Sequence, residues 1–202
     1  MNSEETRRHA VATELACGWH ADQRRKGTDT PYVSHLLQVS GLILEHGGSS
    51  DQAIAGLLHD CLEDAPDPAE RVHREGVIEA SFGEAVARMV LDCTDTAAED
   101  SIEEKGPWRE RKERYLRQLA AASGESRLVA ACDKRHNLHS MVWDIRADGP
   151  SVLERFSGKP DQQIWYFESV LALVRDAIPS RLLAEIEDLL EDFRALVTSV
   201  DA

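Results

Sequence analysis

A chain of 202 residues is long enough for one domain with a real core and short for two independent ones. Its composition, 42% hydrophobic and 30% charged residues, is that of an ordinary globular protein and excludes a disordered or fibrous design. The 23 Lys and Arg residues against 37 Asp and Glu residues give a formal net charge of −14, which repels phosphate backbones and anionic lipid surfaces, so nucleic acid is not expected as a partner.

Neither a membrane span nor a secretory signal is expected. No apolar run approaches the ~18 residues of a membrane span, and the first ten residues lack the pattern of a signal peptide. We therefore expect a cytoplasmic protein with no membrane partner. The four cysteines are widely spaced and form no C-x-x-C pair, which favours buried reduced thiols over disulfides or a cysteine-ligated zinc site.

Apolar residues recur every three to four positions along the chain without convincing period-two runs, so the fold is predicted to be all-α. Gly and Pro residues mark the stops between helices. The longest predicted loops, near residues 95–106 and 147–160, are candidate rims or lids of a site. In chain order, helices are expected at about residues 4–25, 34–46, 51–64, 68–80, 82–94, 107–122, 125–143, 161–176 and 181–198.

One compact multi-helix domain is expected over residues 1–180, followed by a C-terminal amphipathic helix over residues 181–202. This helix carries a broad apolar stripe opposed by acidic residues. Such a stripe either packs on the domain or forms a dimer interface, so a homo-oligomer stays open.

The segment 53–64 is an apolar helical stretch that gains four polar groups at its C-terminal end. Glu63 stands four residues after His59, and Asp64 stands four after Asp60. On a helix these side chains would form one patch of imidazole and carboxylates. Such a patch beside buried leucines is unfavourable unless a cation or another partner compensates it.

Two further segments place polar side chains next to apolar ones. Asp133 follows five small or apolar residues, and Asn137 lies one helical turn later on the same face. His35 stands in the first turn of a predicted helix that has an apolar face. Taken singly, such an Asp is more often a cap or an ion-pair partner, and such a His is usually packed or capping.

Taken together, the two histidines and two aspartates provide nitrogen and oxygen ligands for a divalent ion such as manganese, iron or zinc, without selecting among them. The predicted ligand set is His35, His59, Asp60 and Asp133. The other six histidines lack a comparable carboxylate neighbourhood and are expected to be structural, with His136 the least certain of them.

The order of these motifs resembles the HD-domain metal-dependent phosphohydrolases, and in particular the hydrolase domain of the RelA/SpoT family and the stand-alone small alarmone hydrolases. The resemblance covers roughly residues 5–175. Its motifs are Arg25-Lys26-Gly27, Pro31-Tyr32-x-x-His35, Leu57-Leu58-His59-Asp60-x-x-Glu63-Asp64, Phe82-Gly83 and Asp133-x-x-His136-Asn137.

This resemblance implies a helical domain with one manganese ion that removes pyrophosphate from the 3′ position of guanosine tetra- or pentaphosphate. It implies that the histidine and aspartate set holds the metal and that Glu63 and Asp64 are the catalytic acidic pair. Asn137 would support the substrate or the metal shell, and Arg25 and Lys26 would contact the nucleotide. No synthetase activity is expected, because the chain leaves no room for a synthetase domain.

Two basic clusters admit two interpretations each. The Arg24-Arg25-Lys26 run could be the solvated end of a helix, where cations favour the helix dipole, although the neighbouring motif favours phosphate or base binding. The second cluster could offer a basic wall to a phosphate or could coat an amphipathic helix; it consists of Trp108, Arg109, Arg111, Lys112 and Tyr115.

The chemistry expected is attack of a metal-activated water on phosphorus, with Glu63 and Asp64 orienting the water or exchanging its proton. Two alternatives remain open. The first is an HD-family phosphatase that acts on nucleoside monophosphates or another phosphate ester. The second is a non-catalytic nucleotide-binding scaffold with a structural metal, which the acidic pair argues against because a structural site needs only its ligands.

Overall fold

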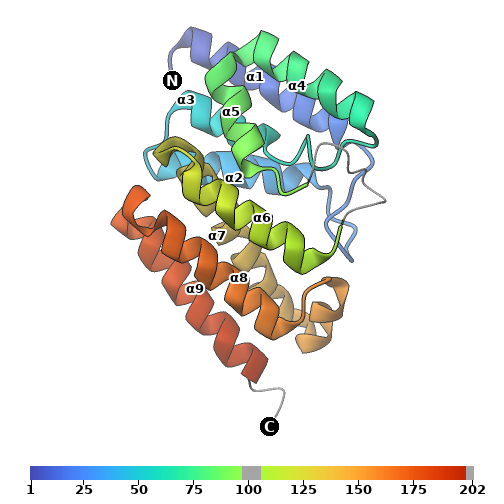
Figure 1. Ribbon diagram of the computed structural model, residues 1–202, viewed down its shortest axis with the longest axis vertical. Helices are drawn as coiled ribbons and strands as arrows, with labels where there is room; N and C mark the ends of the chain where they lie inside the picture. The colour runs from blue at the N-terminus through green and yellow to red at the C-terminus, as the bar shows by residue number, and fades with distance from the viewer. Residues whose placement is uncertain (97–105, 199–202) are drawn as a thin grey trace.

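The structure, a computed structural model, describes residues 1–96 and 106–198, and within these residues every regular element is helical apart from a single bridge between Arg24 and Pro31. This confirms the predicted all-α fold. Figure 1 shows the two termini at opposite ends of the long axis, with α1 and α4 near one end and α8 and α9 near the other. The elements are α1 (Ser3–Trp19), α2 (Val33–Glu45), α3 (Ser50–Leu58), α4 (Pro68–Phe82), α5 (Glu84–Cys93), α6 (Trp108–Ala121), α7 (Gly124–Asp148), η1 (Pro150–Arg155), α8 (Pro160–Val174), η2 (Arg175–Ala177) and α9 (Ser180–Thr198).

Several helix starts are encoded by side-chain caps. The Asn2 side chain accepts hydrogen bonds from the first turn of α1, and Ser49 and Gln52 form a reciprocal capping box at the start of α3. Asp67 caps α4, which has a proline at its first position, where the missing N–H costs nothing. These local signals fix where α1, α3 and α4 begin.

The centre of the molecule is formed by α3 and α7. Helix α3 packs against α1, α2, α5 and α7, and all its residues from 52 to 58 are buried. Helix α7 packs against α2, α3, α5, α8 and α9. Polar residues in or next to these two helices therefore lie deep in the protein, where an unpaired charge is costly.

The last helix, α9, packs against α7 and α8 and buries Leu182, Ile186, Leu190 and Phe193. These residues recur at three- and four-residue intervals, as expected for the apolar stripe of an amphipathic helix. The division of the chain into residues 1–180 and 181–202 stays a prediction.

Three predicted boundaries are wrong. Helix α1 ends at Trp19 rather than near residue 25, because the chain enters a loop closed by hydrogen bonds from Arg25 N to Thr30 O (2.8 Å) and from Tyr32 N to Gln23 O (3.0 Å). The Arg24-Arg25-Lys26 run is therefore part of this loop and not a helix end. The loop needs Gly27, which has φ +73°, a left-handed conformation that favours glycine.

Helix α3 ends at Leu58, and residues 59–64 form consecutive turns instead of continuing the helix. Helix α7 extends to Asp148, and the predicted loop 147–160 contains the short helix η1 at residues 150–155. Of the other predicted loop, residues 97–105 lie outside the described part of the chain.

The four cysteines are free thiols. Cys61, Cys93 and Cys132 are buried, as expected, whereas Cys17 is exposed. The prediction fails at Cys17 because α1 buries Ala12 and Ala16, and the next residue along the helix points about 100° away from that face. Among the helices described, none is long and apolar enough to cross a membrane.

Candidate metal centre and nucleotide cavity

The four predicted ligands come from three places that the fold brings together. His35 lies in the first turn of α2, His59 directly follows the last residue of α3, and Asp133 lies within α7. Asp60 is in the turn that begins where α3 ends. The early end of α3 therefore aims the His59-Asp60 pair at α2 and α7.

The side chains form one tight cluster. His35 Nε2 lies 3.3 Å from His59 Nε2, 3.2 Å from Asp133 Oδ1 and 3.5 Å from Asp60 Oδ2. His59 Nε2 lies 3.0 Å from Asp60 Oδ2 and 3.4 Å from Asp133 Oδ1. His35, His59 and Asp133 each direct one ligand atom into a space that could hold a metal ion, and all three are buried. Asp60 contacts both histidines, so the structure brings all four predicted residues together.

Hydrogen bonds outside the cluster orient both imidazoles. His59 Nδ1 lies 2.9 Å from the Gly56 carbonyl oxygen, which only accepts, so in the neutral ring Nδ1 carries the proton and Nε2 offers its lone pair to the cluster. His35 Nδ1 lies 2.8 Å from His136 Nδ1. Burial, together with His35 and Arg25, lowers the pKa of His136 to about 3, so this ring is neutral and its Nδ1 can accept a hydrogen bond from His35 Nδ1–H.

Each carboxylate is also held from outside. The Tyr32 hydroxyl donates to Asp60 Oδ2 at 2.6 Å. The Asn137 amide donates to Asp133 Oδ1 at 2.6 Å, and Lys134 Nζ lies 2.5 Å from Asp133 Oδ2. These partners fix the positions of oxygens that would otherwise rotate, which is the usual role of groups around metal ligands.

The electrostatics suit a cation. Although burial raises it, Lys134 and His59 hold the pKa of Asp133 well below its ordinary range, so this residue stays anionic. Burial lowers the pKa of His59, but Asp60 and Asp133 outweigh it and raise that pKa well above its ordinary value. The cluster therefore attracts a positive charge, and a proton competes with a metal for His59. Two nitrogen and two carboxylate donors fit a divalent ion of intermediate hardness.

The side chains of the predicted catalytic pair, Glu63 and Asp64, contact different neighbours. Asp64 Oδ2 accepts a hydrogen bond from Gln23 Nε2 (2.8 Å) in the loop after α1. Glu63 Oε1 lies 3.9 Å from an Arg111 nitrogen on α6, and Glu63 also hydrogen-bonds Asp95. The expected contiguous helical patch is therefore not formed, because the regular α-helix ends at Leu58 and residues 59–64 form turns. The catalytic role of the two acids stays a prediction.

A cavity of about 730 Å³ lies directly over the cluster. Its lining includes four residues that each hydrogen-bond a predicted ligand, whereas the ligands themselves lie behind them. These four are Tyr32, Lys134, His136 and Asn137. The cavity is open and large enough for a nucleotide.

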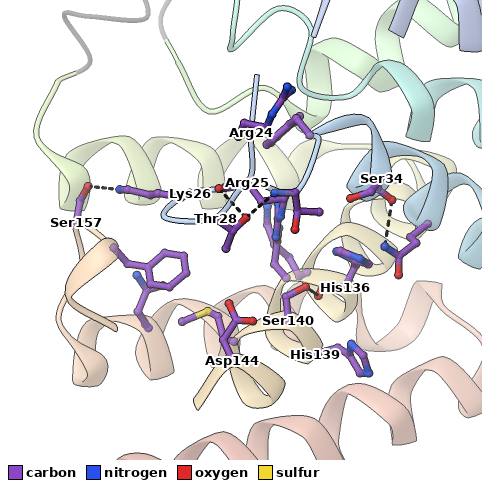
Figure 2. Close-up of a pocket in the computed structure, with 18 of the residues that line it drawn as sticks. Arg24, Arg25, Lys26, Thr28, Ser34, His136, His139, Ser140, Asp144 and Ser157 are labelled. Carbon is purple, nitrogen blue, oxygen red and sulfur yellow. Dashed lines mark hydrogen bonds between the residues drawn. The ribbon is translucent and has the colours of Figure 1, made fainter. Parts of the chain in front are cut away.

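The charges that line the cavity are mostly positive. The lining contains two acidic residues, Asp64 and Asp144. It contains six Arg and Lys residues: Arg24, Arg25, Lys26, Arg111, Lys112 and Lys134. Figure 2 shows the loop that carries Arg25, Lys26 and Thr28 facing His136, Ser140 and Asp144 of α7 across the cavity, with Lys26 reaching Ser157. In a protein of net charge −14, this local reversal of sign marks the place where an anion would bind.

The residues predicted to bind substrate all line this cavity. Arg25 donates to the Asn137 side-chain oxygen (3.0 Å), and Lys26 Nζ lies 3.5 Å from the Ser157 hydroxyl. Of the basic residues on α6, Arg111 and Lys112 line the cavity wall. Trp108 lines it as well, whereas Arg109 and Tyr115 do not, so the cavity wall includes only part of the predicted set.

Sequence reasoning missed several residues around the cluster. His136 was expected to be structural, yet it contacts His35, and its place three residues after Asp133 on one helix was a usable signal. The links from Tyr32 to Asp60 and from Lys134 to Asp133 depend on tertiary packing. So does the placement of Trp143, which is 53% exposed and lines the cavity.

The sequence of this chain is similar to one protein family and to several known proteins. The HD-domain family model matches residues 12–154. The guanosine-3′,5′-bis(diphosphate) 3′-pyrophosphohydrolase MESH1 of Xenopus tropicalis is 33% identical over 133 residues, which cover 64% of this chain and 67% of the relative. The MESH1 of Homo sapiens is 32% identical over 133 residues, again with 64% and 67% covered.

Two solved structures share the fold. One, described as a metazoan ortholog of SpoT that hydrolyses ppGpp, superposes with a TM-score of 0.70 at 23% identity and covers 91% of this chain and 94% of that chain. A second, from Listeria monocytogenes EGD-e, has a TM-score of 0.64 at 26% identity and covers 78% and 96%. The HD-domain family model matches well over half of the 202 residues of this chain, so the chain belongs to the HD-domain family.

Proposed function

We propose that this protein hydrolyses the 3′-pyrophosphate of guanosine tetra- and pentaphosphate. The observation that carries the proposal is the cluster of two histidines and two aspartates directly beneath a cationic cavity in an otherwise acidic protein. The names of the similar proteins support this substrate.

The proposed metal is one manganese ion, held by His35, His59, Asp60 and Asp133. Its donor set of two imidazoles and two carboxylates supports a divalent ion of this class. When bound, the ion would lower the pKa of a water molecule and neutralise charge on a phosphoryl oxygen.

In the proposed reaction, the oxygen of a water molecule forms a bond to the phosphorus next to the ribose 3′ oxygen. The bond between that phosphorus and the 3′ oxygen breaks, the 3′ oxygen takes up a proton, and pyrophosphate leaves with the oxygen of the water. Asp64, which lines the cavity, would orient the water or accept its proton. Glu63, held between Arg111 and Asp95, would exchange a proton from the side of α6.

We further propose that the substrate is a free nucleotide rather than a nucleic acid, which the net charge of −14 supports. Three buried free thiols support a reducing compartment, the cytoplasm. The oligomeric state stays a prediction.

The test is a substrate panel. Manganese-loaded protein is incubated with guanosine tetraphosphate, the adenosine analogue and nucleoside monophosphates, and the products are identified. The proposal expects pyrophosphate and guanosine diphosphate from the tetraphosphate. Orthophosphate from monophosphates, with no pyrophosphate from the tetraphosphate, would establish the broader phosphatase activity instead. Metal binding without turnover of any substrate would indicate a scaffold.

A further inference from the structure

The cations of the cavity form two groups. One lies on the side of Asp133 Oδ1 and the other on the side of Asp133 Oδ2. On the Oδ1 side, Asn137 links Asp133 to Arg25 through hydrogen bonds of 2.6 and 3.0 Å. On the Oδ2 side, Lys134 contacts Asp133 directly, and Arg111 and Lys112 line the same cavity from α6. A substrate that reacts next to Asp133 would therefore have one basic group on each side of its reacting phosphorus.

The second group, which we call the inner basic wall, consists of Arg111, Lys112 and Lys134. Their side chains are only 11%, 16% and 14% exposed. Both lysine ammonium groups lie over the Tyr166 ring, with Nζ at 4.7 Å from its centroid for Lys112 and 5.7 Å for Lys134. Cations so poorly hydrated gain more from an anionic ligand than cations in open water do.

The inner basic wall is held from behind by Asp95. This carboxylate is 4% exposed, lies outside the cavity lining, and ion-pairs with both Arg111 (2.5 Å) and Lys112. Its backbone carbonyl also accepts a hydrogen bond from Arg114 at 2.9 Å. Although burial raises it, Lys112, Arg111 and a hydrogen bond from Glu63 hold the pKa of Asp95 at about 2, so it is ionised at any physiological pH.

The two sides of the cavity differ in what else they offer. Beyond Arg25 and Asn137, the lining from α7 contains His139, Ser140 and the half-exposed Trp143, groups that can hydrogen-bond or stack with a nucleoside. The side of the inner basic wall concentrates three cations beside the predicted ligand Asp133. The first side suits a nucleoside with its 5′ phosphates, and the second suits a compact, highly charged anion.

We propose that Arg111, Lys112 and Lys134 form the subsite for the 3′-pyrophosphate, and that the buried Asp95 is the positioning residue that holds Arg111 and Lys112 in place. This inference rests on the proposed function. In the reaction written above, the wall binds the pyrophosphoryl group before the bond to the 3′ oxygen breaks, and it holds the released pyrophosphate afterwards. Arg25 and Lys26 contact the nucleotide product.

The test measures equilibrium binding of labelled inorganic pyrophosphate and of labelled guanosine diphosphate to manganese-loaded protein. Removing a charge-assisted contact should weaken pyrophosphate binding about tenfold or more in Lys112→Gln. Asp95→Asn should weaken it to a similar degree, and Asp95→Glu should restore part of the affinity. Guanosine diphosphate should bind all three variants within about twofold of the wild type, because its contacts lie on the other side of Asp133.

The matched control is Arg117→Gln, which removes one positive charge from an exposed position of the same helix and should change neither affinity. Metal content and circular dichroism verify that each variant is loaded and folded. If Asp95→Asn does not fold, Lys112→Gln decides the question.

The subsite is overturned if Lys112→Gln weakens the binding of both ligands equally, or if it leaves the affinity for pyrophosphate unchanged. Hydrolysis of guanosine tetraphosphate by the wild type is measured separately. Its absence overturns the proposed function, whereas normal hydrolysis combined with unchanged pyrophosphate binding in Lys112→Gln overturns the subsite alone.

Discussion

Replacing Asp95 by Asn should destabilise the protein by an amount that depends on pH. The side chain is 4% exposed and pairs with Arg111 and Lys112, so an uncharged amide leaves two poorly exposed cations without their counter-ion. The pKa of Asp95 falls from an ordinary 3.8 to about 2 in the folded protein. At ~1.4 kcal/mol per pKa unit, that difference corresponds to about 2 kcal/mol of folding free energy.

The sign follows from the direction of the shift. Because the folded-state pKa of Asp95 is depressed, its contribution is fully present above the unfolded-state value of 3.8 and is lost as the pH falls towards 2. Linkage between these two values leaves about half of the contribution at pH 3, so about 1 kcal/mol should disappear between pH 6 and pH 3.

The assay is urea denaturation of metal-free wild-type and Asp95→Asn protein at pH 6 and pH 3. At pH 6 the variant should have a free energy of unfolding at least about 2 kcal/mol lower, and this gap should narrow by about 1 kcal/mol at pH 3. A variant as stable as the wild type at pH 6, or a gap that stays the same at both pH values, would refute the assigned ion pairs.

Four further predictions address the site and the core. Glu63→Gln should keep the fold and the metal but lose turnover, since the amide cannot exchange a proton; loss of metal on elemental analysis would make this residue a ligand instead. Asp133→Ala should abolish stoichiometric metal binding, and full occupancy in that variant would remove the residue from the site. Reversing Arg25 and Lys26 to Glu should mainly raise KM with the metal content unchanged, and a normal KM in steady-state kinetics would exclude them from substrate binding. Gly56→Ala should cost about 1–3 kcal/mol in thermal or urea unfolding, because the new methyl group would lie 2.4 Å from a side-chain carbon of α2; an unchanged midpoint would contradict this packing.

Much of the fold followed from apolar periodicity and from stop residues. The order of helices from α1 to α9 matches the predicted order, since an amphipathic stripe is a local property of the sequence. The predicted helix boundaries were wrong where tertiary contacts determine the end of a helix. The loop after α1 is held by backbone hydrogen bonds between Arg25 and Thr30 and by the side chain of Gln23 on Asp64, and neither has a signature at helical spacing.

The candidate ligand cluster was predictable because polar residues that emerge from apolar helices are conspicuous. His59, Asp60 and Asp133 all have this signature, and the fold brings them together. Asp95 has no such signature, since its partners on α6 are distant along the chain and only folding places them behind the cavity. Residues that act through another side chain are therefore the part of a site that a single sequence reveals least.

The central claim is the release of pyrophosphate from the 3′ position of guanosine tetraphosphate, and the most direct test is product identification with manganese-loaded wild-type protein beside its Asp133→Ala variant. We predict that the wild type yields pyrophosphate and guanosine 5′-diphosphate in equal amounts and that the variant yields neither. Product formation by the metal-free variant at the wild-type rate, or orthophosphate as the only product of the wild type, would contradict the claim.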